Sequence, residues 1–254
     1  MRRLMRSLLV TRLARALSGG PLQSHLSLAH SLWRATLQAG DIAVDATAGV
    51  GKDASVLASL VGASGKVHAL DVDAAALEAC VQCVRDEAGD AAACLQTSAQ
   101  SHAAPPPGLA PRSATVVAFN LGYLPQRVRR EGDAPTAWGG TPTVGDAPTT
   151  DAATTIEALS SWALGAVRPG GHVSVAVYPA HAAGAREAVA LRAFAGSLSS
   201  SAWRATEHAP INHGPTAPFL LSLHRLYREP PVEYAADDFG GAARAAGEAL
   251  ENVL

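Results

Sequence analysis

Short apolar runs alternate along the chain with longer stretches in which apolar residues recur every three or four positions. The first pattern is typical of buried strands and the second of amphipathic helices. Their alternation predicts an α/β protein built on a mostly parallel sheet. We predict strands at residues 42–45, 66–73, 92–95, 115–120, 172–178, 203–207 and 217–226, and helices at residues 26–39, 54–61, 74–88, 152–167 and 186–198.

Residues 42–53 read Ile-Ala-Val-Asp-Ala-Thr-Ala-Gly-Val-Gly-Lys-Asp and predict a strand, a tight turn and the start of a helix. Gly49 and Gly51 allow the backbone to approach a ligand closely, beside the free N–H groups of the helix start. The G-x-G-x-x-G motif of dinucleotide folds is absent. Asp45 at the strand end instead suits a ligand with an ammonium group, such as the amino-acid end of S-adenosylmethionine.

A second acid, Asp71, ends the next predicted strand, where a ribose can be held by its two hydroxyls. An acid there is common to NAD and S-adenosylmethionine folds, but its combination with Asp45 favours S-adenosylmethionine. The predicted fold is a Rossmann-like class I S-adenosylmethionine-dependent methyltransferase, with a mostly parallel seven-stranded sheet and an antiparallel hairpin at one edge. The alternative is an ordinary turn whose acid caps a helix.

The apolar run of residues 115–119 predicts a buried central strand that ends at Asn120, beside the expected methyl donor. Asn-x-x-Tyr-x-Pro is similar to the Asn/Asp-Pro-Pro-Tyr signature of amino-group methyltransferases. An Asn carbonyl that accepts an amine N–H would hold the amine in line with the departing sulfur. Tyr123 could stack on the target group or wall it off. The alternative is a β-turn at the end of a strand.

Composition limits the wider picture. The chain has 254 residues, 48% of them hydrophobic, which suffices for one large core. No apolar run approaches the ~20 residues that cross a bilayer, so we expect no membrane partner. The C-x-x-C of Cys80 and Cys83 has no second pair, and we predict buried thiols and no metal.

Residues 1–22 carry five arginines and no acid, which is the pattern of an organellar transit peptide. We expect a chloroplast or mitochondrial location, with the chloroplast favoured. The alternative is a basic arm on a cytoplasmic protein, which could touch RNA. In either case, we predict a methyltransferase domain at residues 23–228. Residues 229–254 are predicted to form an accessory tail with one short helix. Because this domain is acidic, a nucleic acid partner needs a local basic patch.

Residues 126–150 form a long segment rich in Gly, Pro and Thr. A loop of this length inside a compact domain is usually functional or disordered. Arg127, Arg129 and Arg130 could bind phosphates, which would make the segment an RNA clamp. A flexible insertion explains it equally well.

With these elements placed, the chain resembles the bacterial and plastid tRNA 5-aminomethyl-2-thiouridine methyltransferases. The resemblance rests on residues 29–32, 45–53, 101–102, 119–125, 154–156, 168–171, 178–181 and 218–221. It implies methyl transfer from S-adenosylmethionine to the aminomethyl nitrogen of a modified wobble uridine. It also implies binding to the tRNA anticodon region, a homodimer and no metal.

Together, the motifs and the resemblance predict three groups of functional residues. The expected cofactor residues are Asp45, Thr47, Gly49, Gly51, Asp53, Asp71, Asp73, Gln100, Ser101, His102 and Asn120. The expected catalytic residues are Asn120, Tyr123, His30 and His181, the last two as alternative bases. The expected substrate residues are Arg127, Arg129, Arg130, Thr154 and Thr155.

Other functions stay open at this point. The same scaffold could methylate an amino group of rRNA or of a small molecule, and such an enzyme would ignore thiolated tRNA. A non-catalytic S-adenosylmethionine-binding protein is a further alternative, which the Asn-x-x-Tyr motif argues against. An NAD-dependent oxidoreductase is a distant third.

Overall fold

Seven strands form one mixed sheet in the computed structural model, which describes residues 24–122, 150–227 and 239–252. The strands are β1 Ile42–Asp45, β2 Lys66–Asp71, β3 Leu95–Ala99, β4 Ala114–Asn120, β5 Val167–Val177, β6 Trp203–His208 and β7 Phe219–Arg225. Their order is β3-β2-β1-β4-β5-β7-β6, and β7 runs antiparallel to both of its neighbours. The predicted seven-stranded sheet with an antiparallel edge hairpin is thus confirmed.

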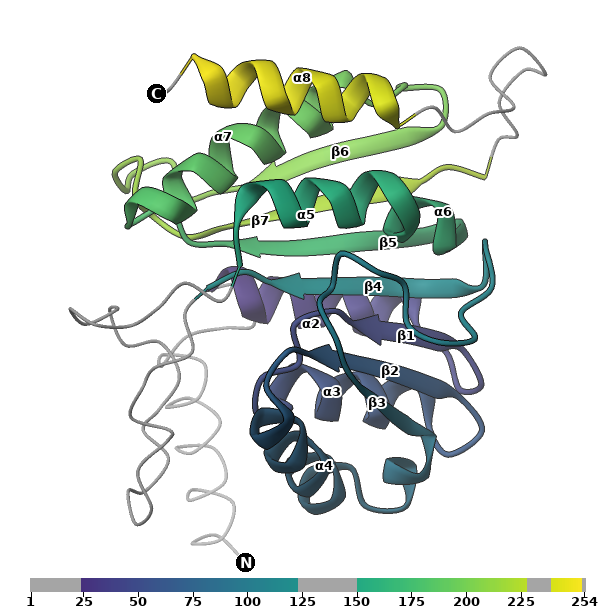
Figure 1. Cartoon of the computed structure of the whole chain (residues 1–254). Coiled ribbons are helices and arrows are strands. Elements are labelled where there is room, and N and C mark those ends of the chain that lie inside the picture. The colour runs from purple at the N-terminus through teal and green to yellow at the C-terminus, as the bar shows by residue number, and fades with distance from the viewer. Residues whose placement is uncertain (1–23, 123–149, 228–238, 253–254) are drawn as a thin grey trace, which may run out of the picture.

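Helices cover both faces of the sheet. They are α2 His25–Thr36, α3 Lys52–Val61, α4 Ala74–Ala88, α5 Ala152–Ala158, α6 Leu164–Ala166, α7 Ala182–Ser197 and α8 Gly240–Glu251. Figure 1 shows α2 and α3 behind the sheet and α5 in front of it. None of the described helices is long and apolar enough to cross a membrane.

The central strand β4 shows why these two layers form. Val116 and Ala118 belong to the hydrophobic core under α2, α3 and α4, whereas Val117 and Phe119 belong to the core under α5, α7 and α8. Successive side chains of a strand point to opposite faces, so a continuous apolar run supplies both cores. The sheet therefore holds the ends of β1, β2 and β4 in a rigid setting.

The carboxyl ends of the parallel strands lie along one edge, on the left of Figure 1. Asp45 pairs with Ala69 of β2 and Ala118 of β4, and Asn120 pairs with Ala176 of β5. This register brings the acids of β1 and β2 and the Asn of β4 to the same edge. Open α/β sheets bind ligands at such an edge, where the strand order reverses.

The third predicted strand exists, but its predicted bounds, residues 92–95, are wrong. Residues Gly89–Cys94 form a 3₁₀ helix, and β3 begins only at Leu95. The strand lies at the edge of the sheet, and Gln96 and Thr97 are exposed. The prediction followed apolar residues, but an edge strand is half polar, and the preceding alanines have little preference for a strand.

The change from helix to strand near residue 167 also differs from the prediction. The helix of residues 152–166 includes a π-helical stretch, Leu159–Ala163, and β5 already begins at Val167. The β4–β5 register shifts between Ala114 and Val116. A Cβ on Gly171 would lie 2.5 Å from the Thr115 carbonyl oxygen. The Arg-Pro-Gly-Gly segment therefore passes the neighbouring strand closely rather than ending outside the sheet.

The predicted helix in the C-terminal tail is confirmed as α8, whose Ala242 and Ala246 are buried in the core with α7. The domain boundaries at residues 22 and 228 fall outside the described residues and stay predictions.

Candidate active site

The turn between β1 and α3 lies across the carboxyl ends of the neighbouring strands. The Ala46 N–H donates to the Ala118 carbonyl, and the Ala48 N–H donates to the Leu70 carbonyl. Gly51 has φ +89°, and a Cβ there would lie 2.7 Å from the Cα of Cys80 on α4. Only glycine fits this position, because both the positive φ and the close helix exclude a side chain. The turn therefore packs closely against α4 at this position.

Asp45 is 1% exposed at the end of β1. Its Oδ1 accepts from the Thr47 N–H at 3.2 Å, whereas its Oδ2 is buried without a hydrogen-bond partner among the described residues. Burial raises the pKa of Asp45 well above its usual value, and the nearby Asp53 raises it further. A buried carboxylate oxygen without a partner calls for a cationic or donor group. The ammonium group of S-adenosylmethionine fits this requirement.

Asp71 ends β2, the strand that pairs with β1. Its Oδ2 accepts from the Gly49 N–H and its Oδ1 from the Asp73 N–H, both at 2.9 Å. Each oxygen has a second lone pair, and two such acceptors side by side suit a vicinal diol. Asp73 in turn begins α4, because its Oδ1 accepts from the Ala75 N–H. Val72 between these acids is 64% exposed, and it offers an apolar face that the sequence analysis missed.

The predicted adenine residues follow β3. Gln100 donates its backbone N–H to the Asp71 carbonyl, and its side chain is bonded to the carbonyls of Ala104 and Pro105. The Ser101 hydroxyl accepts from the Ala103 N–H. These bonds shape the loop beside Asp71, so the backbone of the loop lies next to the expected ribose site.

His102 differs from its two neighbours because it is 7% exposed. Its ring packs edge-on against Phe119 at 5.8 Å between centroids, and its carbonyl accepts from Trp162 Nε1. Burial lowers the pKa of His102 more than Asp151 and Asp71 raise it. The imidazole is therefore neutral, and its Nε2 is buried without a partner among the described residues.

Four side chains from four elements form a hydrogen-bonded chain beside Asp45. His30 Nε2 on α2 lies 2.7 Å from Asp53 Oδ1 on α3, and Asp53 Oδ2 accepts from Asn120 Nδ2 at 3.0 Å. Asn120 Oδ1 accepts from the hydroxyl of Tyr178 at 2.9 Å, and Tyr178 lies just after β5. We call this set the Asn120 chain. The end of β4 is itself anchored, because the Asn120 N–H donates to the Thr47 hydroxyl at 2.7 Å.

The structure brings three predicted histidines to different surroundings. His30 belongs to the Asn120 chain and contacts Trp33. His181 is the N-cap of α7, where its Nδ1 accepts from the Gly184 N–H at 2.9 Å. His102, described above, packs within the fold.

Two further residues were not singled out from the sequence. His25 on α2 packs edge-on against Tyr178 at 5.0 Å between ring centroids, and burial lowers its pKa. Tyr178 lies within a segment that carried the family resemblance, at the end of a predicted strand. That position was the available signal for Tyr178, whereas nothing in the sequence indicated His25.

The predicted substrate residues Thr154 and Thr155 have partners inside the fold. Thr154 bonds to Asp151, the N-cap of α5. Thr155 is fully buried, and its hydroxyl lies 3.5 Å from Glu187 on α7. Contact of either residue with a substrate stays a prediction. Four other predicted residues lie outside the described part of the chain: Tyr123, Arg127, Arg129 and Arg130.

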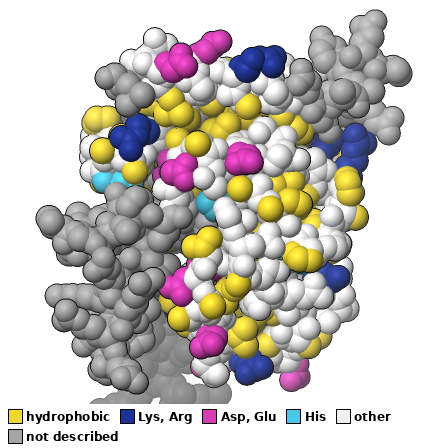
Figure 2. All heavy atoms as spheres, in the orientation of Figure 1, with side chains coloured by type: hydrophobic (Ala, Val, Ile, Leu, Met, Phe, Trp, Pro, Cys, Tyr) yellow, Lys and Arg dark blue, Asp and Glu magenta, His cyan; other side chains and the backbone are white. Residues whose placement is uncertain are grey.

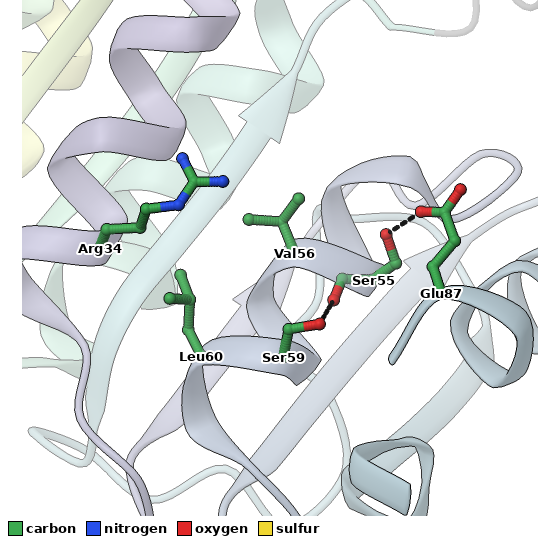
Figure 3. Close-up of a pocket in the computed structure, with 6 residues that line it drawn as sticks. All are labelled: Arg34, Ser55, Val56, Ser59, Leu60 and Glu87. Atoms are coloured by element: carbon green, nitrogen blue, oxygen red, sulfur yellow. Dashed lines mark hydrogen bonds between the residues drawn. The ribbon is translucent and has the colours of Figure 1, made fainter. Parts of the chain in front are cut away.

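A cavity of about 250 Å³ lies between α2, α3 and α4 (Figure 3). Its lining residues are Arg34, Ser55, Val56, Ser59, Leu60 and Glu87. None of the residues assigned to the site lines this cavity. Within the described ranges, no group of three or more His, Cys, Asp or Glu side chains could hold a metal ion.

Solved structures with the same fold define the class. A protein from Clostridium thermocellum called a "putative rRNA-methylase" is 25% identical, with a TM-score of 0.68 over 80% of this chain and 98% of that one. A Streptococcus mutans protein called "a putative methyltransferase", solved in complex with SAH, is also 25% identical, with a TM-score of 0.63 over 80% of this chain and 99% of that one. The fold and the site therefore define a class I methyltransferase that uses S-adenosyl-L-methionine.

Sequence relatives narrow the class to a family. The profile described as "Putative rRNA methylase" matches residues 139–224. The chloroplastic tRNA (mnm(5)s(2)U34)-methyltransferase of Arabidopsis thaliana is 30% identical over 206 residues, which cover 78% of this chain and 68% of the relative. The chain belongs to the family of this methyltransferase.

Proposed function

We propose that this enzyme transfers the methyl group of S-adenosylmethionine to the nitrogen of a 5-aminomethyl group on the wobble uridine of tRNA. The observation that carries the proposal is the Asn120 side chain at the end of β4, whose carbonyl oxygen faces away from Asp53. A fixed carbonyl oxygen suits an acceptor with an N–H to donate. The name of the Arabidopsis relative supports tRNA as the source of that amine.

The cofactor residues divide along the edge of the sheet. Asp45 Oδ2 would take the ammonium group, and the glycine turn would lie along the methionine part. Asp71 would take the ribose hydroxyls, with Val72 and the 100–102 loop around the adenine. When bound, S-adenosylmethionine supplies an electrophilic methyl group on a sulfonium sulfur.

The acceptor must lose a proton before it can attack. An alkylamine has a pKa near ~10, so most of it is protonated at neutral pH. His30 and His181 remain our candidates for the base. The His30 ring nitrogen beside Asp53 links it to Asn120, whereas the His181 nitrogen that caps α7 is occupied by a backbone N–H. The bonding pattern favours His30 because it belongs to the Asn120 chain.

Recognition of RNA needs positive charge. On the face drawn in Figure 2, the lysine and arginine side chains of the described residues lie apart from one another, with acidic side chains between them. We propose that Arg127, Arg129 and Arg130 bind phosphates of the anticodon region, and that the enzyme acts as a homodimer. Replacing the three arginines with serine should raise the KM for tRNA and leave the affinity for S-adenosylmethionine unchanged.

The decisive experiment is methyl transfer from labelled S-adenosylmethionine to tRNA from cells that lack this enzyme, followed by mass spectrometry of the nucleosides. We expect 5-aminomethyl-2-thiouridine to become its methylaminomethyl form. Cofactor binding without tRNA methylation would refute the proposal. The acceptor would then be sought first in rRNA, which the name of the matched profile suggests, and then among small amines.

We also propose that the protein works in an organelle, and in the chloroplast rather than the mitochondrion. The arginines of residues 1–22 and the chloroplastic relative support this location. Fusion of the first thirty residues to a fluorescent protein tests it, and a cytoplasmic signal would contradict it.

A further inference from the structure

Asn120 has two chemically different ends, and the hydrogen bonds around it determine which end an acceptor meets. Asp53 Oδ2 lies 3.0 Å from one end and the Tyr178 hydroxyl lies 2.9 Å from the other. An ionised carboxylate only accepts hydrogen bonds, so the end facing Asp53 must be the NH₂ group. A flipped amide would place two oxygen acceptors against each other. Asp53 therefore turns the carbonyl oxygen of Asn120 toward Tyr178.

Tyr178 holds that oxygen in place. Burial, and then the Asp53 charge, raise the pKa of the phenol, so the hydroxyl stays protonated and donates. The ring is packed edge-on against His25, which limits its movement. A carbonyl oxygen accepts two hydrogen bonds, and Tyr178 uses one. No other donor among the described residues bonds to Asn120 Oδ1, so one of its lone pairs is available to the acceptor.

Asp53 is itself held from the other side. His30 Nε2 lies 2.7 Å from Asp53 Oδ1, so both carboxylate oxygens have partners within the protein. The sequence predicted Asp53 as a cofactor residue. Its bonds in the structure point instead to Asn120.

We propose that Asp53 and Tyr178 are positioning residues that orient the Asn120 amide, so that a single oxygen lone pair meets the N–H of the acceptor amine. This inference rests on the proposed function, because it specifies how the same site holds its acceptor. It assigns to Asp53 and Tyr178 a role in turnover rather than in cofactor binding. A misplaced acceptor is costly, since a shift of ~1 Å can lower a rate about 100-fold.

Two nearly isosteric variants test the proposal. Asp53→Asn allows the amide of Asn120 to flip, and Tyr178→Phe removes one hydroxyl while keeping the ring against His25. We expect kcat to fall about 30-fold in the first variant and about tenfold in the second. The KM for the acceptor and the Kd for S-adenosylmethionine should stay within about threefold of wild type. Tyr227→Phe is the matched control, because Tyr227 is 81% exposed and lies outside the site.

The double variant separates positioning from a merely structural role. Both residues act through one amide, so Asp53→Asn with Tyr178→Phe should lose little more kcat than Asp53→Asn alone. The pH profile of kcat should keep its shape in Tyr178→Phe, because the hydroxyl does not exchange a proton with the acceptor. Losses that multiply, or single variants with wild-type kcat, would overturn the inference.

A measurement without substrate keeps this inference distinct from the proposed function. The side-chain NH₂ of Asn120, assigned by its loss in Asn120→Ala, should give a slowly exchanging NMR signal in wild type and faster exchange in both variants. If wild type does not methylate tRNA, the proposed function fails, and the NMR signals still decide the orientation. Exchange rates equal to wild type in both variants would overturn the inference that Asp53 and Tyr178 orient the Asn120 amide.

Discussion

Two sets of polar side chains lie in different parts of the fold, the first partly buried and the second centred on a fully buried histidine. At the carboxyl edge, the Asn120 chain joins four elements, and each of its members has a hydrogen-bond partner. Further down β5, His172 is fully buried with its ring 4.8 Å from His224, and neither of its nitrogens has a partner among the described residues. Burial, and then His224, lower the pKa of His172 to about 3.

The two sets differ in whether their polar atoms have hydrogen-bond partners among the described residues. Polar groups that satisfy one another across several elements form a rigid, oriented site, since each bond restricts its neighbours. A buried imidazole without partners remains neutral and contributes nothing that an apolar side chain of similar size could not. We therefore expect substitutions in the first set to change turnover and substitutions in the second to change only stability.

The largest expected effect is on turnover. Asn120→Ala removes the oxygen that faces the acceptor and should lower kcat at least about 100-fold, while the Kd for S-adenosylmethionine changes by less than about threefold. Single-turnover methylation and a cofactor titration measure the two quantities. An equally large loss of cofactor affinity would contradict the role in orienting the acceptor.

The buried acid Glu187 is an intermediate case, because it has a weak hydrogen-bond partner. Glu187 is 2% exposed, and burial raises its pKa to about 7, with Thr155 at 3.5 Å as a weak partner. Because the folded pKa exceeds the unfolded value, the folded state binds more protons between pH 4.5 and 7. Stability from this group is therefore present at low pH and lost as pH rises through that window.

Glu187→Gln should remove this loss, which amounts to at most about 3 kcal/mol. Urea unfolding at pH 5 and pH 7.5 measures it. Glu157→Gln is the matched control, because Glu157 on α5 is exposed. Equal pH dependence in wild type and Glu187→Gln would show that the carboxyl ionises freely in the folded protein.

His172 should change stability with pH in the opposite direction to Glu187. The folded pKa of His172 lies below its unfolded value of 6.5, so the unfolded state binds more protons as pH falls. Between pH 6.5 and 5 this costs about 2 kcal/mol of stability. His172→Leu should abolish that loss and leave methyl transfer at pH 7.5 unchanged. Reduced turnover in this variant would break the distinction between the two sets.

The smallest expected effect concerns the cofactor acid. Asp45→Asn removes a charge that is buried beside Asp53, so the cofactor-free protein should melt at a higher temperature. The same change weakens the ammonium site, and we expect the Kd for S-adenosylmethionine to rise about tenfold. Calorimetric titration and thermal unfolding give the two values. An unchanged Kd would place the ammonium group elsewhere.

Predictions from the sequence succeeded where a local pattern had one physical reading. The glycines at 49 and 51 required a tight turn, and the apolar run of β4 required a central strand. They failed where the position of a segment in the sheet and its neighbouring strands determined its structure. The predicted bounds of edge strand β3 were wrong because its residues are half polar, and the close passage of Gly171 beside Thr115 depends on a neighbouring strand.

The sequence by itself determined the order of strands and helices, the position of the glycine turn and the acids that end the first two strands. These features depend on residues close together in the chain, where periodicity and backbone freedom act directly. Only the tertiary structure decided the partners of Asp53. It placed His30 and Asn120 on its two oxygens and Tyr178 beyond them. Such pairings arise when separate elements pack on one sheet, and no local pattern specifies them.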